Sequence, residues 1–207
     1  LQRRDYEEES LMIDTLHKNN LGVAYPIQCK DNGFVWTIPA PEGERHAILF
    51  TEAKNQPAKD DLKNMNHLGA MIADIHLTAD KNDFQISRPP IDMVQLIDNP
   101  LKSLKQHFGN READYRFFSE SMEKLSRFIE NSLSTSKPYY GFCHGDIHLS
   151  NVNFDGDQPV IFDFDCMGYG WRAHDIAVFL FNSSLRNDKY IESEQWKSFL
   201  NGYQSVR

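Results

Sequence analysis

The sequence has 207 residues, 40% of them hydrophobic, and a formal net charge of −8. A chain of this length can bury one good core. The acidic charge argues against nucleic acid as a partner, because phosphate backbones are bound by clustered Lys and Arg, whereas it would suit a cationic small molecule. No apolar run approaches the roughly 18 residues of a membrane helix, so we expect no membrane partner and a cytoplasmic location.

The first third of the chain predicts a small α+β unit. Helical spacing of apolar residues from 5 to 20 predicts an amphipathic helix. Two β-like runs follow at 34–38 and 47–51, and the intervening residues 39–43 are typical of a hairpin turn. The polar, proline-containing stretch 54–59 is the best candidate for a linker between two lobes.

The rest of the chain is predicted to be mainly helical. Two long helices carry apolar stripes that we interpret as core: Leu62, Met65, Leu68, Ile72 and Ile75 in one, and Tyr115, Phe118, Met122, Leu125 and Ile129 in the other. Short strands are expected at 141–143, 152–154 and 160–162, with helices again at 173–185 and from 194 onward. The predicted fold class is therefore α+β, and the chain divides into a small lobe at 1–53 and a mainly helical lobe at 54–207.

Two short segments carry the residues that chemistry would need. The first is His144-Gly-Asp146-Ile-His148-Leu-Ser-Asn151, and the second is a β-like run that ends at Asp163. In kinase catalytic loops an Asp is followed five residues later by an Asn that binds metal, which is the offset from Asp146 to Asn151. A second Asp after a short strand supplies the other metal ligand. Mg²⁺ prefers such oxygen donors, so Asn151 and Asp163 are the predicted metal ligands.

Together these segments resemble the aminoglycoside phosphotransferase and choline kinase superfamily. The resemblance is carried by His144, Asp146, His148, Asn151, the run Phe162-Asp163-Phe164-Asp165, the run Gly168-Tyr169-Gly170 and the run Asp175-Ile176-Ala177. It implies a bilobal, protein-kinase-like fold and ATP- and Mg²⁺-dependent phosphate transfer, with Asp146 as the catalytic carboxylate. Gly145 replaces the Arg of the protein-kinase His-Arg-Asp motif and no Ala-Pro-Glu follows, which favours the hydroxyl of a small molecule as acceptor.

The resemblance extends to the front of the chain. Glu9 matches the helix Glu that pairs with a phosphate-binding Lys, although a solvated surface charge is an equal alternative. Residues 49–53 resemble the hinge that receives adenine, which would assign the carbonyl of Thr51 and the amide of Ala53. No glycine-rich turn or Lys-bearing strand precedes Glu9, so we expect a fragment of a longer protein that is inactive by itself.

The sequence leaves the roles of three further residues open. His148 could contact substrate or phosphate, or it could orient the loop. Asp175 is expected to cap its helix or anchor the catalytic loop rather than to act as a catalyst. Asp165 could assist the metal or attract a cationic substrate.

Two other functions remain as alternatives. A nucleotide-binding pseudokinase is one, although the presence of Asp146, Asn151 and Asp163 together argues against it. The other is an HD-type metal phosphohydrolase, because His144, the pair His174-Asp175 and Asp188 occur in the order that such enzymes use. Those enzymes are all-helical, whereas His144 follows a predicted strand.

Overall fold

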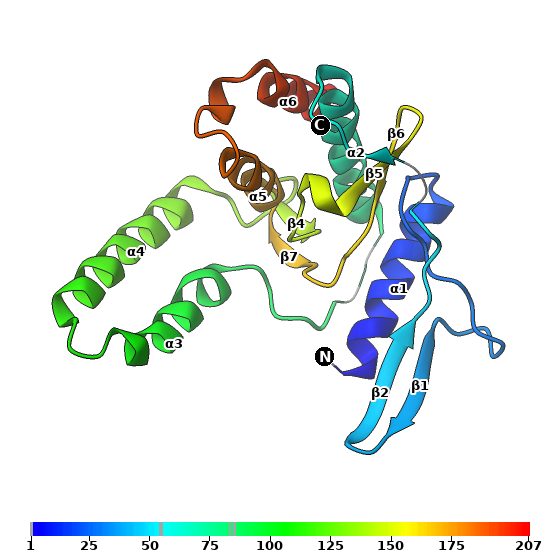
Figure 1. The fold of residues 1–207 in the computed structure, drawn as a ribbon, viewed down its shortest axis with the longest axis horizontal. Coiled ribbons are helices and arrows are strands. Elements are labelled where there is room, and N and C mark those ends of the chain that lie inside the picture. Colours follow the sequence, from blue (N-terminus) through cyan, green and yellow to red (C-terminus); the bar gives the residue numbers. More distant parts are fainter. Residues whose placement is uncertain (1, 54–55, 83, 85) are drawn as a thin grey trace.

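The computed structural model describes residues 2–53, 56–82, 84 and 86–207 and has the predicted α+β class. Helix α1 (Arg3–Lys18) packs against the hairpin of β1 (Val35–Ala40) and β2 (Gly43–Ile48) on one side of the molecule, with the helical part beside it (Figure 1). None of the described helices is both long enough and apolar enough to cross a membrane.

The front segment, residues 2–53, forms largely as predicted. Met12, Ile13 and Leu16 of α1 are buried in the main core. The hairpin turn is tighter than predicted, because Ala40 already pairs with Gly43 and only two residues remain between the strands. The second strand ends at Ile48 and does not reach residue 51. Beyond it, Thr51 donates its backbone N–H to the carbonyl of Tyr25 at 2.9 Å, which holds the predicted hinge against the segment after α1.

Two small sheets frame the predicted catalytic loop. The strands β5 (Val152–Asp155) and β6 (Gln158–Ile161) form a hairpin, and β3 (Gln56–Pro57) pairs with β5. Strand β4 (Tyr140–Cys143) pairs antiparallel with β7 (Gly168–Trp171). Of the predicted linker 54–59, Lys54 and Asn55 lie outside the described residues, and the strand β3 ties the next two residues to the sheet.

The core of the helical part lies where α2 (Leu62–Lys81) crosses α6 (Glu194–Val206), with α5 (Arg172–Ser184) and the 3₁₀ turn η3 (Tyr190–Glu192) alongside. The predicted stripe of α2 is buried except for its first residue, Leu62. The two long helices approach closely because glycines meet backbone at the crossing. A Cβ on Gly69 would overlap the carbonyl of Phe199, and one on Gly202 would overlap that of Asn66.

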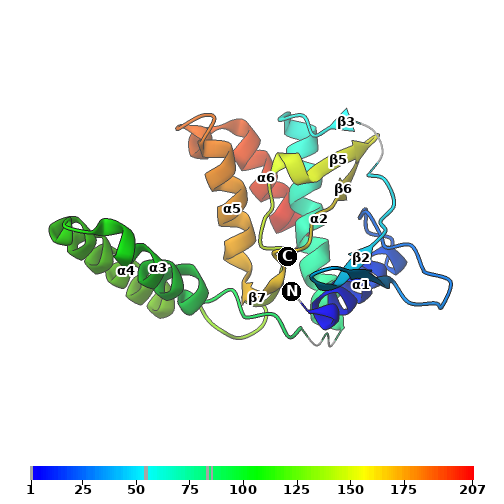
Figure 2. The same ribbon diagram turned by 60° about the horizontal axis from the view of Figure 1, so that its bottom comes forward.

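The prediction of a core stripe on the second long helix is wrong. That helix, α4 (Glu112–Ser132), pairs with α3 (Asn99–Phe108) in a hairpin that extends away from the body (Figure 2). No residue of α4 is buried, and Phe118 and Leu125 are exposed. Only Met122 and Ile129 pack on a small second cluster, which includes Ile97 of the π-helical segment η1 (Val94–Asp98). Helical periodicity marks an apolar face, but it does not say what covers that face.

Candidate active site

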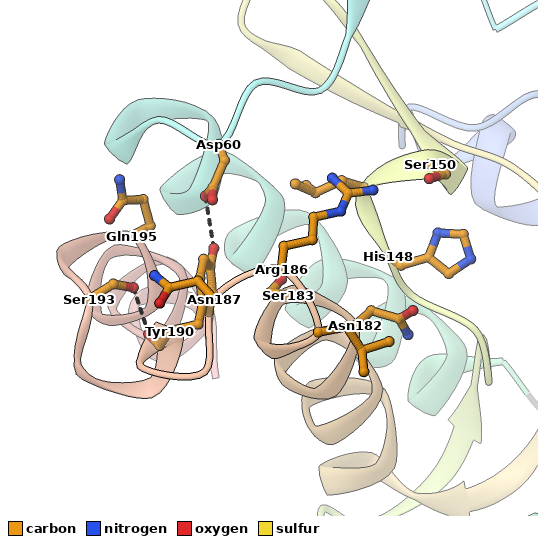
Figure 3. A pocket seen from close by; sticks show the side chains of 12 residues that line it. Asp60, His148, Ser150, Asn182, Ser183, Arg186, Asn187, Tyr190, Ser193 and Gln195 are labelled. Carbon is orange, nitrogen blue, oxygen red and sulfur yellow. Dashed lines mark hydrogen bonds between the residues drawn. The ribbon is translucent and has the colours of Figure 1, made fainter.

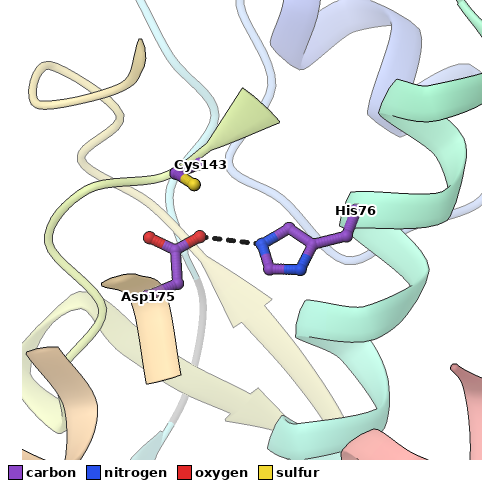
Figure 4. A group of neighbouring side chains, drawn as sticks. All are labelled: His76, Cys143 and Asp175. Carbon is purple, nitrogen blue, oxygen red and sulfur yellow. Dashed lines mark hydrogen bonds and ion pairs between the residues drawn. The ribbon is translucent and has the colours of Figure 1, made fainter. Parts of the chain in front are cut away.

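The predicted catalytic loop, residues 144–151, follows β4 and is anchored by a buried carboxylate. Asp175, in the first turn of α5, accepts the backbone N–H groups of His144 at 2.9 Å and Gly145 at 2.8 Å. His76 of α2 reaches the same carboxylate with Nε2 at 2.8 Å (Figure 4). Burial would raise the pKa of Asp175, but the hydrogen bonds and the neighbouring imidazoles lower it to about 2. Asp175 therefore anchors the loop as an anion, as expected, and both of its carboxylate oxygens are engaged by protein groups.

His76, Cys143 and Asp175 stand close enough together to resemble a metal site (Figure 4). The donor atoms, however, are already used within the protein. The thiol of Cys143 donates to the carbonyl of Trp171 at 3.3 Å, and burial raises its pKa, which disfavours the thiolate that a metal requires. His76 Nδ1 lies 2.9 Å from the hydroxyl of Tyr203. This cluster is a hydrogen-bond network that supports the loop.

His144 joins the catalytic loop to the segment that carries Asp163. Its ring is buried, with Nδ1 accepting the backbone N–H of Asp146 at 3.2 Å and Nε2 donating to the carbonyl of Phe162 at 3.1 Å. Burial lowers the pKa of His144, so the ring stays neutral, and one nitrogen can accept while the other donates. Both ring nitrogens are thus occupied, which leaves none for the metal that the HD-type alternative requires.

Asp146 and Asn151 lie together, as the five-residue offset predicts. Asn151, in the short 3₁₀ helix η2 (Leu149–Asn151), directs Nδ2 to the carbonyl of Asp146 at 3.1 Å and to its Oδ2 at 3.4 Å. His148 Nε2 stands 3.3 Å from the same Oδ2. Among the described residues nothing donates to Asp146 Oδ1. The arrangement therefore leaves a carboxylate oxygen of Asp146 and the amide oxygen of Asn151 available to ligands.

Asp163 follows β6 in a conformation that few residues adopt. Its φ is 67°, in the left-handed region that Asp and Asn tolerate better than most residues. The neighbouring backbone N–H of Phe162 donates to the carbonyl of Asn151 at 3.1 Å, which brings the two predicted metal ligands onto adjoining segments. A hydrogen bond with Asp165, burial, and the charges of Asp165 and Asp146 raise the pKa of Asp163. A bound cation would reduce the electrostatic repulsion among these carboxylates.

A cavity of about 560 Å³ connects Asp163 to the front segment. This volume falls within the range of about 300–1,000 Å³ that is typical of ligand pockets. The residues that line it come from α1, the segment after α1, the hinge, and residues 162–165, which carry the predicted metal ligand Asp163 and are termed the metal segment: Glu9, Ile13, Ala24, Phe50, Thr51, Ala53, Phe162, Asp163, Phe164 and Asp165. All three residues that sequence reasoning assigned to the nucleotide therefore line one cavity.

The backbone of the hinge offers the two groups that were expected to receive adenine. Thr51 uses its own N–H and hydroxyl on Tyr25, and the carbonyl of Ala53 accepts Asn153 Nδ2 at 2.7 Å. Within the described ranges the carbonyl of Thr51 and the amide of Ala53 have no protein partner. A donor and an acceptor therefore remain at the edge of the cavity.

Glu9 has a partner that sequence reasoning missed. Its carboxylate is buried and accepts Arg88 Nη2 at 2.5 Å. Arg88 also donates Nη1 to the carbonyls of Asp165 at 2.5 Å and Phe164 at 3.3 Å. Burial raises the pKa of Glu9 although Arg88 opposes the shift. The surface-charge interpretation of Glu9 is wrong, since this pair joins α1 to the metal segment.

His76 could have been found from the sequence, whereas Arg88 could not. His76 falls four residues after Ile72, on the apolar face of the predicted α2, and a histidine in a buried stripe signals a buried polar partner. Arg88 precedes two prolines in an irregular segment with no periodicity, so nothing local indicates its partners.

Known proteins match this chain over most of its residues. Residues 21–206 match the model of the phosphotransferase enzyme family. An uncharacterized protein of Synechocystis is 35% identical over 198 residues, which is 94% of this chain and 54% of that protein. Amicoumacin kinase of Bacillus subtilis is 42% identical over 169 residues, or 78% of this chain and 48% of the kinase.

A solved structure agrees in fold. Amicoumacin kinase hAmiN, in complex with AMP-PNP, Ca²⁺ and amicoumacin, superposes with a TM-score of 0.77 at 23% identity, over 100% of this chain and 63% of that one. The chain spans about half the length of the curated relatives named above. The match over most of its residues confirms the resemblance drawn from the catalytic loop, and the chain belongs to the phosphotransferase enzyme family.

Proposed function

We propose that this chain carries the catalytic part of an ATP-dependent kinase that phosphorylates a hydroxyl group of a small molecule, with Mg²⁺ as the metal. The observation that carries the proposal is the meeting of Asp146, Asn151 and Asp163 on adjoining segments, next to a cavity that the hinge also lines. The carboxylate that orients the acceptor hydroxyl and the oxygen ligands that hold Mg²⁺ each have a candidate there.

The donor set suits a hard divalent cation. Asn151 points its amide nitrogen at Asp146, which leaves its oxygen for a metal, and Asp163 contributes a carboxylate. A hydrogen bond with Asp165, burial and the charges of Asp165 and Asp146 raise the pKa of Asp163, and a cation would offset the repulsion among these carboxylates. Mg²⁺ commonly takes one or two protein carboxylates and fills its other positions with phosphate and water. Bound there, it would neutralise charge on the phosphates.

Asp146 is the group that we assign to the acceptor hydroxyl. Its Oδ2 is engaged by Asn151 and His148, and its Oδ1 accepts nothing from the described residues. A hydroxyl that donates to Oδ1 is oriented for attack on the γ-phosphorus. In the proposed transfer the new O–P bond would form as the bond to the β-phosphate oxygen breaks, ADP would leave, and Asp146 would accept the hydroxyl proton. His148 would hold the carboxylate in this orientation.

The nucleotide would lie in the cavity between hinge and metal segment. The carbonyl of Thr51 and the amide of Ala53, which have no partner among the described residues, match the donor and acceptor of an adenine edge, and Arg88 links Glu9 to the backbone of Asp165. Glu9 is positioned to orient a cation that binds phosphate, and its second carboxylate oxygen has no partner in the described part of the chain.

The test is turnover by the full-length protein with Mg²⁺ and ATP against a panel of small hydroxylated compounds, measured as ADP release with product detection by phosphorus NMR. Asp146→Asn should lower kcat by about 10²- to 10⁴-fold while ATP affinity changes little. ATP binding without transfer to any acceptor would favour the pseudokinase alternative. An Asp146→Asn variant with more than a tenth of the wild-type rate would refute the assignment.

A further inference from the structure

A second, smaller pocket opens on the other side of the catalytic loop. It has a volume of about 280 Å³, and His148 and Ser150 of the loop form one of its walls (Figure 3). Leu149 also lines it. The end of α5 and the turn that follows form the opposite wall, which includes Asn182 and Arg186. Because His148 also contacts Asp146, this pocket adjoins the carboxylate that we assign to the acceptor hydroxyl.

The size of this pocket suits a small ligand. Its volume lies just below the range of about 300–1,000 Å³ typical of pockets for drug-sized ligands. A metabolite of a few carbon atoms fits this space, whereas a multi-ring aminoglycoside would extend well beyond it.

The free charge in this pocket is positive. Its only acidic lining residue among those described is Asp60, which accepts the hydroxyl of Tyr190 at 2.8 Å and stands at the end away from His148 (Figure 3). The guanidinium of Arg186 has no carboxylate or carbonyl partner in the described ranges, and Figure 3 shows it directed toward the Ser150 side. The nucleotide cavity, by contrast, is lined by Glu9, Asp163 and Asp165.

We infer that the acceptor is a small hydroxyl compound that also carries a carboxylate, and that Arg186 is the residue that selects it. A guanidinium matches a carboxylate with two parallel N–H donors and remains charged at every physiological pH. The acceptor would place its hydroxyl at Asp146 and its carboxylate at Arg186. This differs from the cationic acceptor that the net charge suggests, because the local charge of the pocket acts on a small ligand more strongly than the distant surface does. The inference rests on the proposed function.

Matched acceptor pairs that differ only by a carboxylate test this inference. We choose serine with ethanolamine, homoserine with 3-aminopropan-1-ol, and glycerate with ethylene glycol. With the full-length protein and saturating Mg·ATP, kcat/KM should favour the carboxylate member of at least one pair by about 10- to 100-fold. Arg186→Gln should reduce that ratio to near one by slowing only the carboxylate member, and Arg186→Lys should keep part of the preference.

Lys189→Gln is the matched control, since Lys189 is an exposed cation three residues further along that does not line the pocket. It should leave the ratio unchanged. The inference is wrong if no carboxylate compound is phosphorylated, if the decarboxylated members are used equally well, or if Arg186→Gln slows both members alike. Failure of Mg·ATP to bind would overturn the proposed function itself, whereas Mg·ATP binding with preferred transfer to amino alcohols would overturn only the carboxylate inference.

Discussion

Asp163 is held where its negative charge is unfavourable unless a cation is present. The hydrogen bond with Asp165, partial burial and the neighbouring charges raise its pKa above the value of an unfolded chain. The folded protein therefore binds the proton more tightly than the unfolded chain does. The free energy of unfolding falls as pH rises through the shifted pKa, and the penalty persists at neutral pH.

Asp163→Asn should therefore raise the melting temperature of the metal-free protein at neutral pH. Because the side chain is exposed and screened by solvent, we expect a rise of only about 1–3 °C. The same change should weaken the stabilisation that Mg²⁺ with ATP provides. Asp188→Asn, at an exposed loop position, should do neither. A lower melting temperature for metal-free Asp163→Asn, measured by calorimetry, would contradict the repulsion argument.

Two buried histidines make the loop sensitive to acid. Burial lowers the pKa of His76 and of His144, so the folded protein keeps both rings neutral while the unfolded chain protonates them below about pH 6.5. Stability is thus lost as pH falls below that value, by up to about 1.4 kcal/mol per pH unit for each ring.

Urea unfolding at pH values between about 7 and 5 measures this slope. His144→Gln should lower stability at pH 7 but flatten the dependence on pH, since one of the two protonating groups is gone. His107→Gln, which removes an exposed ring on α3, should leave the slope as it is. Equal slopes in the wild type and in His144→Gln would show that His144 is not held neutral.

The packing of the predicted catalytic loop against its neighbouring segment requires a glycine, Gly145, where protein kinases carry an arginine. Gly145 has a φ of 88°, and a Cβ there would overlap the carbonyl oxygen of Cys166, so the loop and the metal segment pack backbone to backbone. An arginine could not occupy this position without separating them. The departure from the protein-kinase motif therefore has a steric cause in this fold.

A residue other than glycine in the left-handed conformation costs about 1–2 kcal/mol. Gly145→Ala should lower the free energy of unfolding by more than this, because overlap with the Cys166 carbonyl adds to the loss. Gly156→Ala is the control: Gly156 has a φ of 62°, and a Cβ there would meet nothing within 4 Å. The difference between the two free energies of unfolding isolates the packing of the loop. Equal losses would mean that the loop and the metal segment do not touch as described.

The sequence predicted individual helices and strands better than it predicted which elements pack against them. The strands β4, β5 and β6 and the apolar stripe of α2 follow from local pattern, because Gly and Asp punctuate the strands and a core helix repeats every three to four residues. The strands β3 and β7 were not predicted. The position of α4 does not follow from its stripe, since Phe118 and Leu125 have the spacing of core residues and yet are exposed. Which element faces a stripe is decided by tertiary topology.

Across the whole molecule, a buried ion pair connects the front segment to the metal segment. Arg88 holds Glu9 of α1 with one nitrogen and the backbone of Phe164 and Asp165 with another. The partners are 79 positions apart in the chain, which is why no local pattern indicates the contact. The motif residues 146, 151 and 163 could be predicted because their spacing is itself the signal.

A double-mutant cycle measures this connection. Arg88→Met should cost roughly 3–5 kcal/mol, because it leaves the Glu9 carboxylate buried and unpaired. Adding Glu9→Gln should recover part of that loss, with a coupling energy of about 1–3 kcal/mol. The exposed pair Arg3–Glu7 on the same helix is the control, with an expected coupling below about 1 kcal/mol. Additive effects at Glu9 and Arg88 would contradict a direct buried pair.

The binding of ATP to the full-length protein, measured by calorimetry with and without Mg²⁺, decides whether Asn151 and Asp163 hold a metal. If Asn151 and Asp163 hold the metal against the phosphates, Mg²⁺ should raise ATP affinity at least about tenfold in the wild type and in Asp188→Asn. Asp163→Asn should lose that enhancement. ATP binding that is independent of Mg²⁺, or an enhancement that survives in Asp163→Asn, would contradict the account.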